Sequence, residues 1–269
     1  MFEDKLRAAA AYVAAMGYTP VYVSLHGSQN YGLAVHTDAY QSDYDFKCIV
    51  LPSLWDFVEG KRPASLTVDT GGGQIDIKDI RVLCDALERM NPAYLECLAT
   101  KHYLILPGGE GMEAMRAHLP ELMTQRAARF AQACAGLFED KAKRMSHDSP
   151  AAHERIVRYG YDGKQPHHMF RLMLLLRDFD ERGKLLLEAP QKEQELLMQL
   201  KLNEMPLDEV QKMIPEWRAS LAEVRRRMEE KYGAPKTQAL DQIVRCSHRM
   251  MYAHCLKPEN VDGRNAYAL

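Results

Sequence analysis

The 269-residue chain is 46% hydrophobic and 27% charged, a composition typical of globular proteins, and its length suits one large domain or two smaller ones. Its formal net charge of -2 argues against a protein that binds nucleic acid through an overall basic field. No apolar run is long enough to cross a bilayer, and the first residues lack the pattern of a cleaved signal peptide.

Helices and strands alternate along the first hundred or so residues. The apolar spacing of residues 2–16 predicts a helix, which Gly17 and Pro20 end. The run of β-branched and apolar residues 21–26 predicts the first strand. Similar patterns predict strands over residues 43–51, 66–69, 74–78 and 102–106, with helices over residues 52–60, 79–90 and 93–100 between them.

After residue 107 the chain shows only helical patterns, over residues 108–118, 119–146, 151–159, 166–183, 190–200, 206–232 and 237–256. We therefore predict an α+β fold with a small mixed-sheet domain, residues 1–106, followed by an all-helical domain, residues 107–269.

Six cysteines are spread along the chain without any CxxC pair: Cys48, Cys84, Cys97, Cys134, Cys246 and Cys255. This usage predicts reduced and mostly buried thiols in a cytosolic protein.

The stretch HGSQNYGL, residues 26–33, places a Gly-Ser turn directly after the first predicted strand. A glycine lets the backbone approach an anion closely, and Gly27 and Ser28 offer N–H groups and a hydroxyl to a phosphate. The next strand begins with SDYDF, which carries Asp43 and Asp45. Because side chains alternate along a strand, both carboxylates are expected on one face, where they repel unless water or a cation lies between them.

A third carboxylate, Asp76, stands between two isoleucines in QIDIK. An acidic side chain on a central strand costs stability unless it has a partner, and a metal shared with Asp43 and Asp45 would supply one. A triphosphate resting on Gly27 and Ser28, bridged by metal ions to the aspartates, would suit in-line phosphoryl transfer. Taken singly, a Gly-Ser turn is usually only a turn and a DxD pair a solvated strand edge, so the inference depends on their order along the chain.

These strings together resemble the signature of the DNA polymerase β nucleotidyltransferase superfamily, and within it the predicted nucleotidyltransferases of bacteria and their phages. The similar strings are HGSQNYGL, QSDYDFKCIVLPS, IDIKDIR, NPAYLECL and YGYDGKQPHHMFRL, which span about residues 21–180. The resemblance implies a small mixed sheet with three catalytic, metal-binding carboxylates, here Asp43, Asp45 and Asp76. It also implies Mg²⁺, with Mn²⁺ as a substitute, and a nucleoside triphosphate such as ATP.

Two further features of the resemblance concern the substrates. The loop AVHTDAYQ is longer than in the tighter members of the superfamily, which leaves its substrate contacts open. A related group is associated with RNA repair, so an RNA end is one candidate acceptor.

The string GYDGKQPHHMFRL carries the other candidate binding residues. Pro166 is expected at the first position of a helix, on which His168 and Arg171 share a face. Lys164 lies just before that helix and could reach the same side. Surface helices commonly carry these residue types without a role, but their match to the family's segment favours nucleotide binding, in which three cationic groups would hold the triphosphate.

Several alternatives stay open at the level of sequence. Asp79, the expected cap of helix 79–90, competes with Asp76 for the role of third carboxylate, which would act as general base. The leading function is Mg²⁺-dependent transfer of a nucleotidyl group from an NTP to an unidentified hydroxyl. The alternatives are nucleotidylation of a protein or RNA target in a toxin–antitoxin or phage–host setting, and a non-catalytic nucleotide-binding module.

Overall fold

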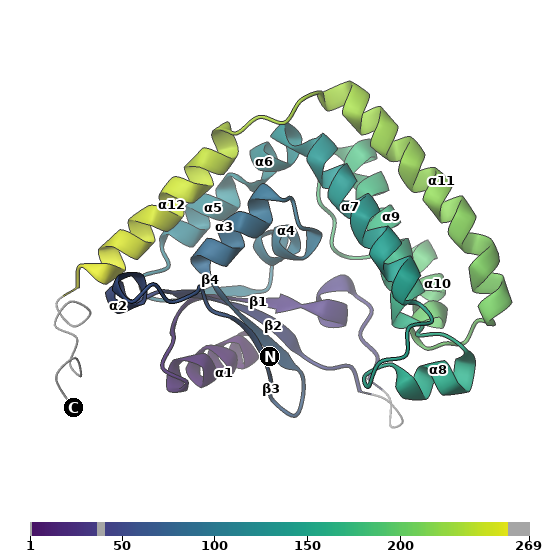
Figure 1. Ribbon diagram of the computed structural model, residues 1–269, viewed down its shortest axis with the longest axis horizontal. Helices are drawn as coiled ribbons and strands as arrows, with labels where there is room; N and C mark the ends of the chain where they lie inside the picture. The colour runs from purple at the N-terminus through teal and green to yellow at the C-terminus, as the bar shows by residue number, and fades with distance from the viewer. Residues whose placement is uncertain (1, 37–40, 258–269) are drawn as a thin grey trace. The chain divides into compact units, whose positions relative to one another are not determined.

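The computed structural model describes residues 2–36 and 41–257, so part of the AVHTDAYQ loop and the residues after Lys257 lie outside it. The fold is α+β, as predicted, with one mixed five-stranded sheet and many helices (Figure 1). The strands are β1 (Thr19–His26), β2 (Asp45–Leu51), β3 (Ser65–Asp69), β4 (Gln74–Asp79) and β5 (Tyr103–Ile105). The helices are α1 (Phe2–Ala15), η1 (Gly27–Tyr31), α2 (Leu54–Val58), α3 (Ile80–Glu88), α4 (Pro92–Ala99), α5 (Gly111–Ala117), α6 (Leu119–Gln125), α7 (Ala127–Arg144), α8 (His153–Tyr159), α9 (Lys164–Arg182), α10 (Gln191–Lys201), α11 (Leu207–Tyr232) and α12 (Gln238–Cys255).

The sheet has the strand order β3-β4-β2-β1-β5. β1 pairs antiparallel with both β2 and β5, β3 and β4 form an antiparallel hairpin, and β2 and β4 run parallel. All five predicted strands are present, but β2 begins at Asp45 rather than at Asp43. The reason is a contact with another hairpin: the N–H of Tyr44 donates to the carbonyl of Gly72 in the β3–β4 turn at 3.0 Å, so the chain bends around that turn before it joins the sheet.

One face of the sheet is apolar and packs on α1. Leu6, Ala9 and Val13 of α1 form a buried cluster with alternate residues of β1, β2 and β4. The spacing of these α1 residues is that of one helix face, and the alternation in the strands gives the sheet its apolar side. In Figure 1, α1 lies on one side of the sheet and α3 and α4 lie on the other.

The other face of the sheet is polar along much of β1, β2 and β4. Toward β5, α4 covers it: the Tyr22 hydroxyl donates to the carbonyl of Cys97 at 2.8 Å, and the Ser24 hydroxyl lies 3.2 Å from the Cys97 sulfur. The polar residues of this face toward β3 and β4 include Asp45 of β2 and Asp76 of β4.

The chain packs as two compact units, and these units do not follow the predicted boundary at residue 106. Of the described residues, the first unit comprises 2–30, 34–36, 41–122 and 237–257, and the second comprises 31–33 and 123–236. The first unit is discontinuous because α12, after the long helical segment, packs against α5 and α3 (Figure 1). Ile243 and Met250 are among its buried residues.

The second unit is a helical bundle in which α9 packs against α7, α10 and α11. Aromatic pairs lie at its centre, with Phe130 edge-on to Phe179 and Phe170 beside Trp217. α9 begins at Lys164, which places Pro166 at the third helical position rather than the first. A proline fits there as well, because the first-turn N–H groups have no partner within the helix.

Within the two described ranges, no helix has the length and apolar character that spanning a bilayer requires. The six cysteines carry free thiols, and Cys48, Cys97, Cys134 and Cys255 are buried. The prediction of mostly buried thiols is therefore confirmed.

Candidate functional site

After β1 the Gly-Ser turn forms a short 3₁₀ helix, η1, at the end of the sheet where β2 begins. Gly27 has φ +71°, a left-handed conformation that favours glycine. A methyl carbon at this position would lie 2.7 Å from Oδ2 of Asp45. The turn and the carboxylate are therefore in direct contact, and His26, the last residue of β1, is the register partner of Asp45.

The segment that carries the two aspartates is held by backbone contacts on both sides. The N–H of Ser42 donates to the carbonyl of Val35 at 2.8 Å, and the Ser42 hydroxyl accepts from the N–H of Val35 at 2.9 Å. On the other side, a side chain at Gly73, where φ is +146°, would collide with the backbone of Tyr44. The TGGG turn between β3 and β4 thus has a structural role that its sequence alone did not show.

Asp43 and Asp45 differ in exposure. Asp43 is exposed and precedes the strand, whereas Asp45 is half-buried and accepts a hydrogen bond from the N–H of Gln74 at 3.2 Å through Oδ1. The expectation that a shared strand places both carboxylates on one face does not apply, because Asp43 is outside β2. The two residues nevertheless flank Tyr44 at the same edge of the sheet.

Asp76 is already paired. Its Oδ2 lies 2.7 Å from Nζ of Lys47, and its Oδ1 lies 2.9 Å from Nζ of Lys78 and 3.2 Å from the Thr67 hydroxyl. Burial by itself would raise the pKa of the Asp76 carboxyl, but the two ammonium groups outweigh it, so the pKa lies below its ordinary value. A carboxylate with a lowered pKa is a weak general base.

The carboxylates at this end of the sheet can be compared with the ligands that a metal ion requires. In the part of the chain that the structure describes, no three His, Cys, Asp or Glu side chains are grouped so that they could hold a metal ion. Both oxygens of Asp76 already bind cations or a hydroxyl, so the three-carboxylate centre does not fit this arrangement. Asp43 and Asp45 have the donor chemistry of a Mg²⁺ site that uses two carboxylates and leaves the remaining positions to phosphate oxygens and water.

The predicted phosphate-binding residues Lys164, His168 and Arg171 lie in the second unit, at the start of α9. Lys164 is exposed, and His168 and Arg171 are half-buried. The guanidinium of Arg171 stacks over the Tyr31 ring, 4.0 Å from its centre, and Tyr31 is buried within the same unit. Their role in binding nucleotide stays a prediction.

Asp79, the rival third carboxylate, is a helix cap, as expected. Its Oδ1 accepts from the backbone N–H of Arg81 at 2.8 Å, and its Oδ2 lies 2.7 Å from a guanidinium nitrogen of the same arginine. The side chain is almost fully buried. Both oxygens of Asp79 therefore serve the start of α3.

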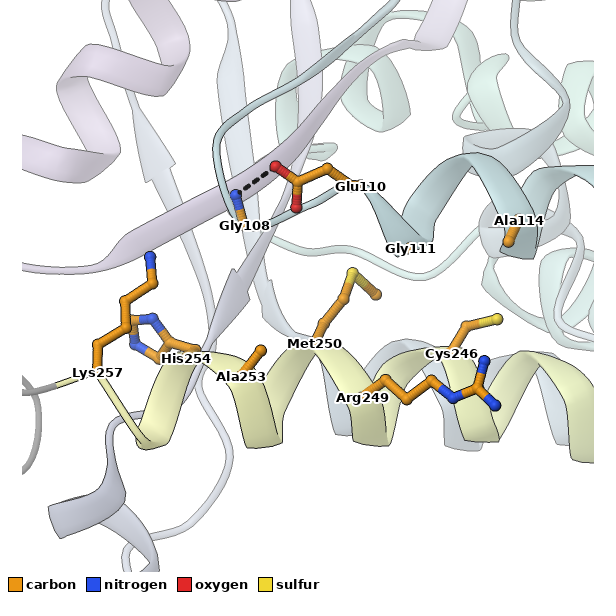
Figure 2. A pocket seen from close by; sticks show the side chains of 10 residues that line it. All are labelled: Gly108, Glu110, Gly111, Ala114, Cys246, Arg249, Met250, Ala253, His254 and Lys257. Carbon is orange, nitrogen blue, oxygen red and sulfur yellow. Dashed lines mark hydrogen bonds between the residues drawn. The ribbon is translucent and has the colours of Figure 1, made fainter.

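A cavity of about 470 Å³ lies elsewhere in the first unit, between α12 and the loop before α5 (Figure 2). Arg249 and His254 of α12 and Lys257, just after that helix, line it, and Glu110 lines it from the loop, where its carboxylate accepts from the N–H of Gly108 at 3.1 Å. None of the predicted site residues lines this cavity.

Lys47, Lys78 and Tyr94 were not identified from the sequence as parts of the site. Lys47 is buried, lies under the Tyr94 ring at 4.8 Å and pairs with Asp76. The only sequence signal was the lysine two positions after Asp45, which the strand period places on the same face. Its pairing with Asp76 depends on the register of β2 and β4, which is a long-range feature.

No protein-family model matches the chain, and no curated protein matches it. Among solved structures, the chain is similar to a nucleotidyltransferase-like protein from Exiguobacterium sibiricum 255-15, with 14% identity over 98% of this chain and 92% of that one. The TM-score is 0.33, and a similarity at this level carries no weight for function.

Proposed function

We propose that the chain is a nucleotidyltransferase, which transfers a nucleotidyl group from an NTP to a hydroxyl acceptor with the help of Mg²⁺. The observation that carries the proposal is the contact between the Gly27 turn and the Asp45 carboxylate, at the edge where β1 ends and β2 begins. A phosphate-binding turn beside a metal-binding carboxylate is the minimum that this reaction requires. The sequence resemblance described above favours the same reaction.

The residues at this edge would have distinct roles. Gly27 and Ser28 would orient the phosphates through N–H and hydroxyl groups, because glycine at residue 27 leaves the turn open. Asp43 and Asp45 would hold Mg²⁺ together with phosphate oxygens, and the bound ion would neutralise charge on the phosphates. In the reaction the acceptor hydroxyl loses its proton to water, its oxygen forms a bond to the α-phosphorus, the bond from that phosphorus to the α–β bridging oxygen breaks, and pyrophosphate leaves.

The acceptor is proposed to be an RNA end, on the sequence resemblance alone. Nucleotidylation of a protein or of an internal RNA target uses the same chemistry and differs only in the acceptor. An assay that offers all of these acceptors at once separates the alternatives, because the labelled product shows which class of acceptor received the nucleotide.

The test is a transfer assay with each α-labelled NTP, total RNA and cell lysate, in the presence of Mg²⁺. The wild type should label one class of acceptor. Asp45→Asn keeps the shape of the side chain and the acceptor for Gln74 but removes a charged ligand, so transfer should fall by about a thousandfold. The melting temperature of the variant is measured beside the transfer rate, so that a loss of activity through unfolding is recognised.

Asp85→Asn is the matched control, because Asp85 is exposed on α3 and the substitution makes the same change of charge. It should transfer at the wild-type rate. Full activity in Asp45→Asn would refute the proposed site. Nucleotide binding without any transfer by the wild type would instead indicate a non-catalytic nucleotide-binding module.

A further inference from the structure

The register between the parallel strands β2 and β4 places Lys47 beside Asp76, the third predicted aspartate. Lys47 of β2 is the partner of Asp76 of β4, and the next residue on the same face of β4 is Lys78. Both lysines reach the same carboxylate, each on its own oxygen. The three side chains form what we call the Asp76 cluster: two ammonium groups and one carboxylate, with a net charge of +1.

The Asp76 cluster is largely shielded from solvent. The side chains of Lys47 and Lys78 are 7% and 13% exposed, and that of Asp76 is 22% exposed. The Lys47 ammonium also lies under the Tyr94 ring. Charges this poorly solvated remain stable only when they are paired, so removing the carboxylate would leave two ammonium groups with little solvation.

A metal ion that used Asp76 as a ligand would have to displace at least one of these ammonium groups. The displaced cation would remain beside the divalent ion, and like charges at such short range repel strongly in a poorly solvated environment.

We propose that Asp76 is a positioning residue and not a metal ligand: it is the counter-ion that holds Lys47 and Lys78 on the polar face of the sheet. The metal site then has two protein carboxylates. The part of this inference that concerns metal rests on the proposed function, whereas the counter-ion role of Asp76 does not.

The first experiment measures the affinity for Mn²⁺ alone, by electron paramagnetic resonance, in two double variants with the same net charge as the wild type. Lys47→Met/Asp76→Asn removes the ion pair, and Asp45→Asn/Lys47→Met removes a proposed ligand with the same loss of one positive and one negative charge. The first variant should bind Mn²⁺ within about threefold of the wild type, and the second should bind at least about tenfold more weakly. A tenfold loss in the first variant would overturn the proposal.

The second experiment is a thermal unfolding cycle on the pair, which needs no metal and no nucleotide. Asp76→Asn alone leaves two unpaired ammonium groups and should lower the melting temperature by about 5 °C. Adding Lys47→Met should restore most of that loss, because only the Lys78 ammonium then remains in the cluster and its net charge is again +1. If the changes in melting temperature caused by the two substitutions are additive, Asp76 is not the counter-ion of Lys47.

The two outcomes separate this proposal from the proposed function. If the wild type binds no Mn²⁺, the metal-dependent function fails, and the unfolding cycle still decides whether Asp76 is a counter-ion. If the wild type binds Mn²⁺ through Asp45 and the cycle shows no coupling, the function survives and the positioning role is refuted.

Discussion

The contact between Gly27 and Asp45 can be tested by a single methyl group. Gly27→Ala must adopt a φ near +71° and bring its Cβ to 2.7 Å from the Asp45 carboxylate, so the turn or the aspartate has to move. We expect a loss of about 2–3 kcal/mol of stability, of which about 1 kcal/mol reflects the backbone conformation. NTP binding should weaken as well, because the turn would no longer fit against the carboxylate.

Gly60→Ala is the control for this prediction. Gly60 has a similar φ of +62°, but a Cβ there would meet nothing within 4 Å. This variant should lose only about 1 kcal/mol, measured by urea unfolding. Equal losses in the two variants would mean that the contact with Asp45 makes no difference.

A buried histidine gives the protein a pH dependence that is independent of any ligand. Burial lowers the pKa of His167 to about 4, while its Nδ1 lies 2.9 Å from the carbonyl of Leu197. Because the ordinary pKa is about 6.5, the folded state favours the neutral ring, and its stabilising contribution is present above pH 6.5 and lost as the pH falls toward 4. Stability should drop by about 2 kcal/mol between pH 7 and pH 5.

His167→Gln should remove that part of the pH dependence, because glutamine keeps an N–H donor for the Leu197 carbonyl and does not titrate in this range. His248→Gln, at an exposed position of α12, should retain it. The measurement is the urea midpoint of all three proteins at both pH values. A slope that His167→Gln leaves unchanged would assign the dependence to other groups.

At the scale of elements, local patterns were sufficient to predict most of the helices and strands. Asp79 and Asn91 cap α3 and α4 through bonds to Arg81 N and Ala93 N, and such caps depend on residues two apart. The same local reasoning misplaced the start of β2, because the bend at Tyr44 depends on Gly72 and Gly73 in another hairpin.

The pairing of elements is the part of the candidate site that a single sequence does not contain. A period of two predicted that Asp45 and Lys47 share a face, but not that Asp76 would lie opposite Lys47. Shifting β4 by one residue would turn Asp76 to the apolar face and Ile75 or Ile77 to the polar one. Register is therefore set by the burial of those isoleucines in the core, which only the folded sheet reveals.

The start of α9 provides the test of the predicted phosphate-binding residues. The side chain of Lys164 is exposed, so Lys164→Ala should leave the melting temperature unchanged. If it binds phosphate, NTP affinity should fall about tenfold to a hundredfold, the range for a charge-assisted contact of about 1.5–3 kcal/mol. Lys184→Ala, another exposed lysine, is the control for the change in net charge. Calorimetry that finds equal NTP affinity in both variants would exclude Lys164 from the site.

At the scale of the whole molecule, the return of α12 to the sheet-containing unit has a measurable consequence. Chain order predicts that α12 stabilises the helical domain, whereas its packing against α3 and α5 predicts that it stabilises the first unit. The chain has two tryptophans, Trp55 in the first unit and Trp217 in the second, so each unit has its own fluorescent reporter. Replacing either one by phenylalanine leaves the other as a single probe.

Ile243 of α12 is fully buried, and Ile243→Ala should cost about 2–4 kcal/mol through lost burial and the cavity that remains. Since α12 belongs to the first unit, the unfolding transition reported by Trp55 should move to lower urea, while that reported by Trp217 moves less. Tyr252→Ala, on the same helix but 69% exposed, should shift neither transition. A shift confined to the Trp217 transition would contradict the packing of α12 with the sheet-containing unit and would support the division in chain order.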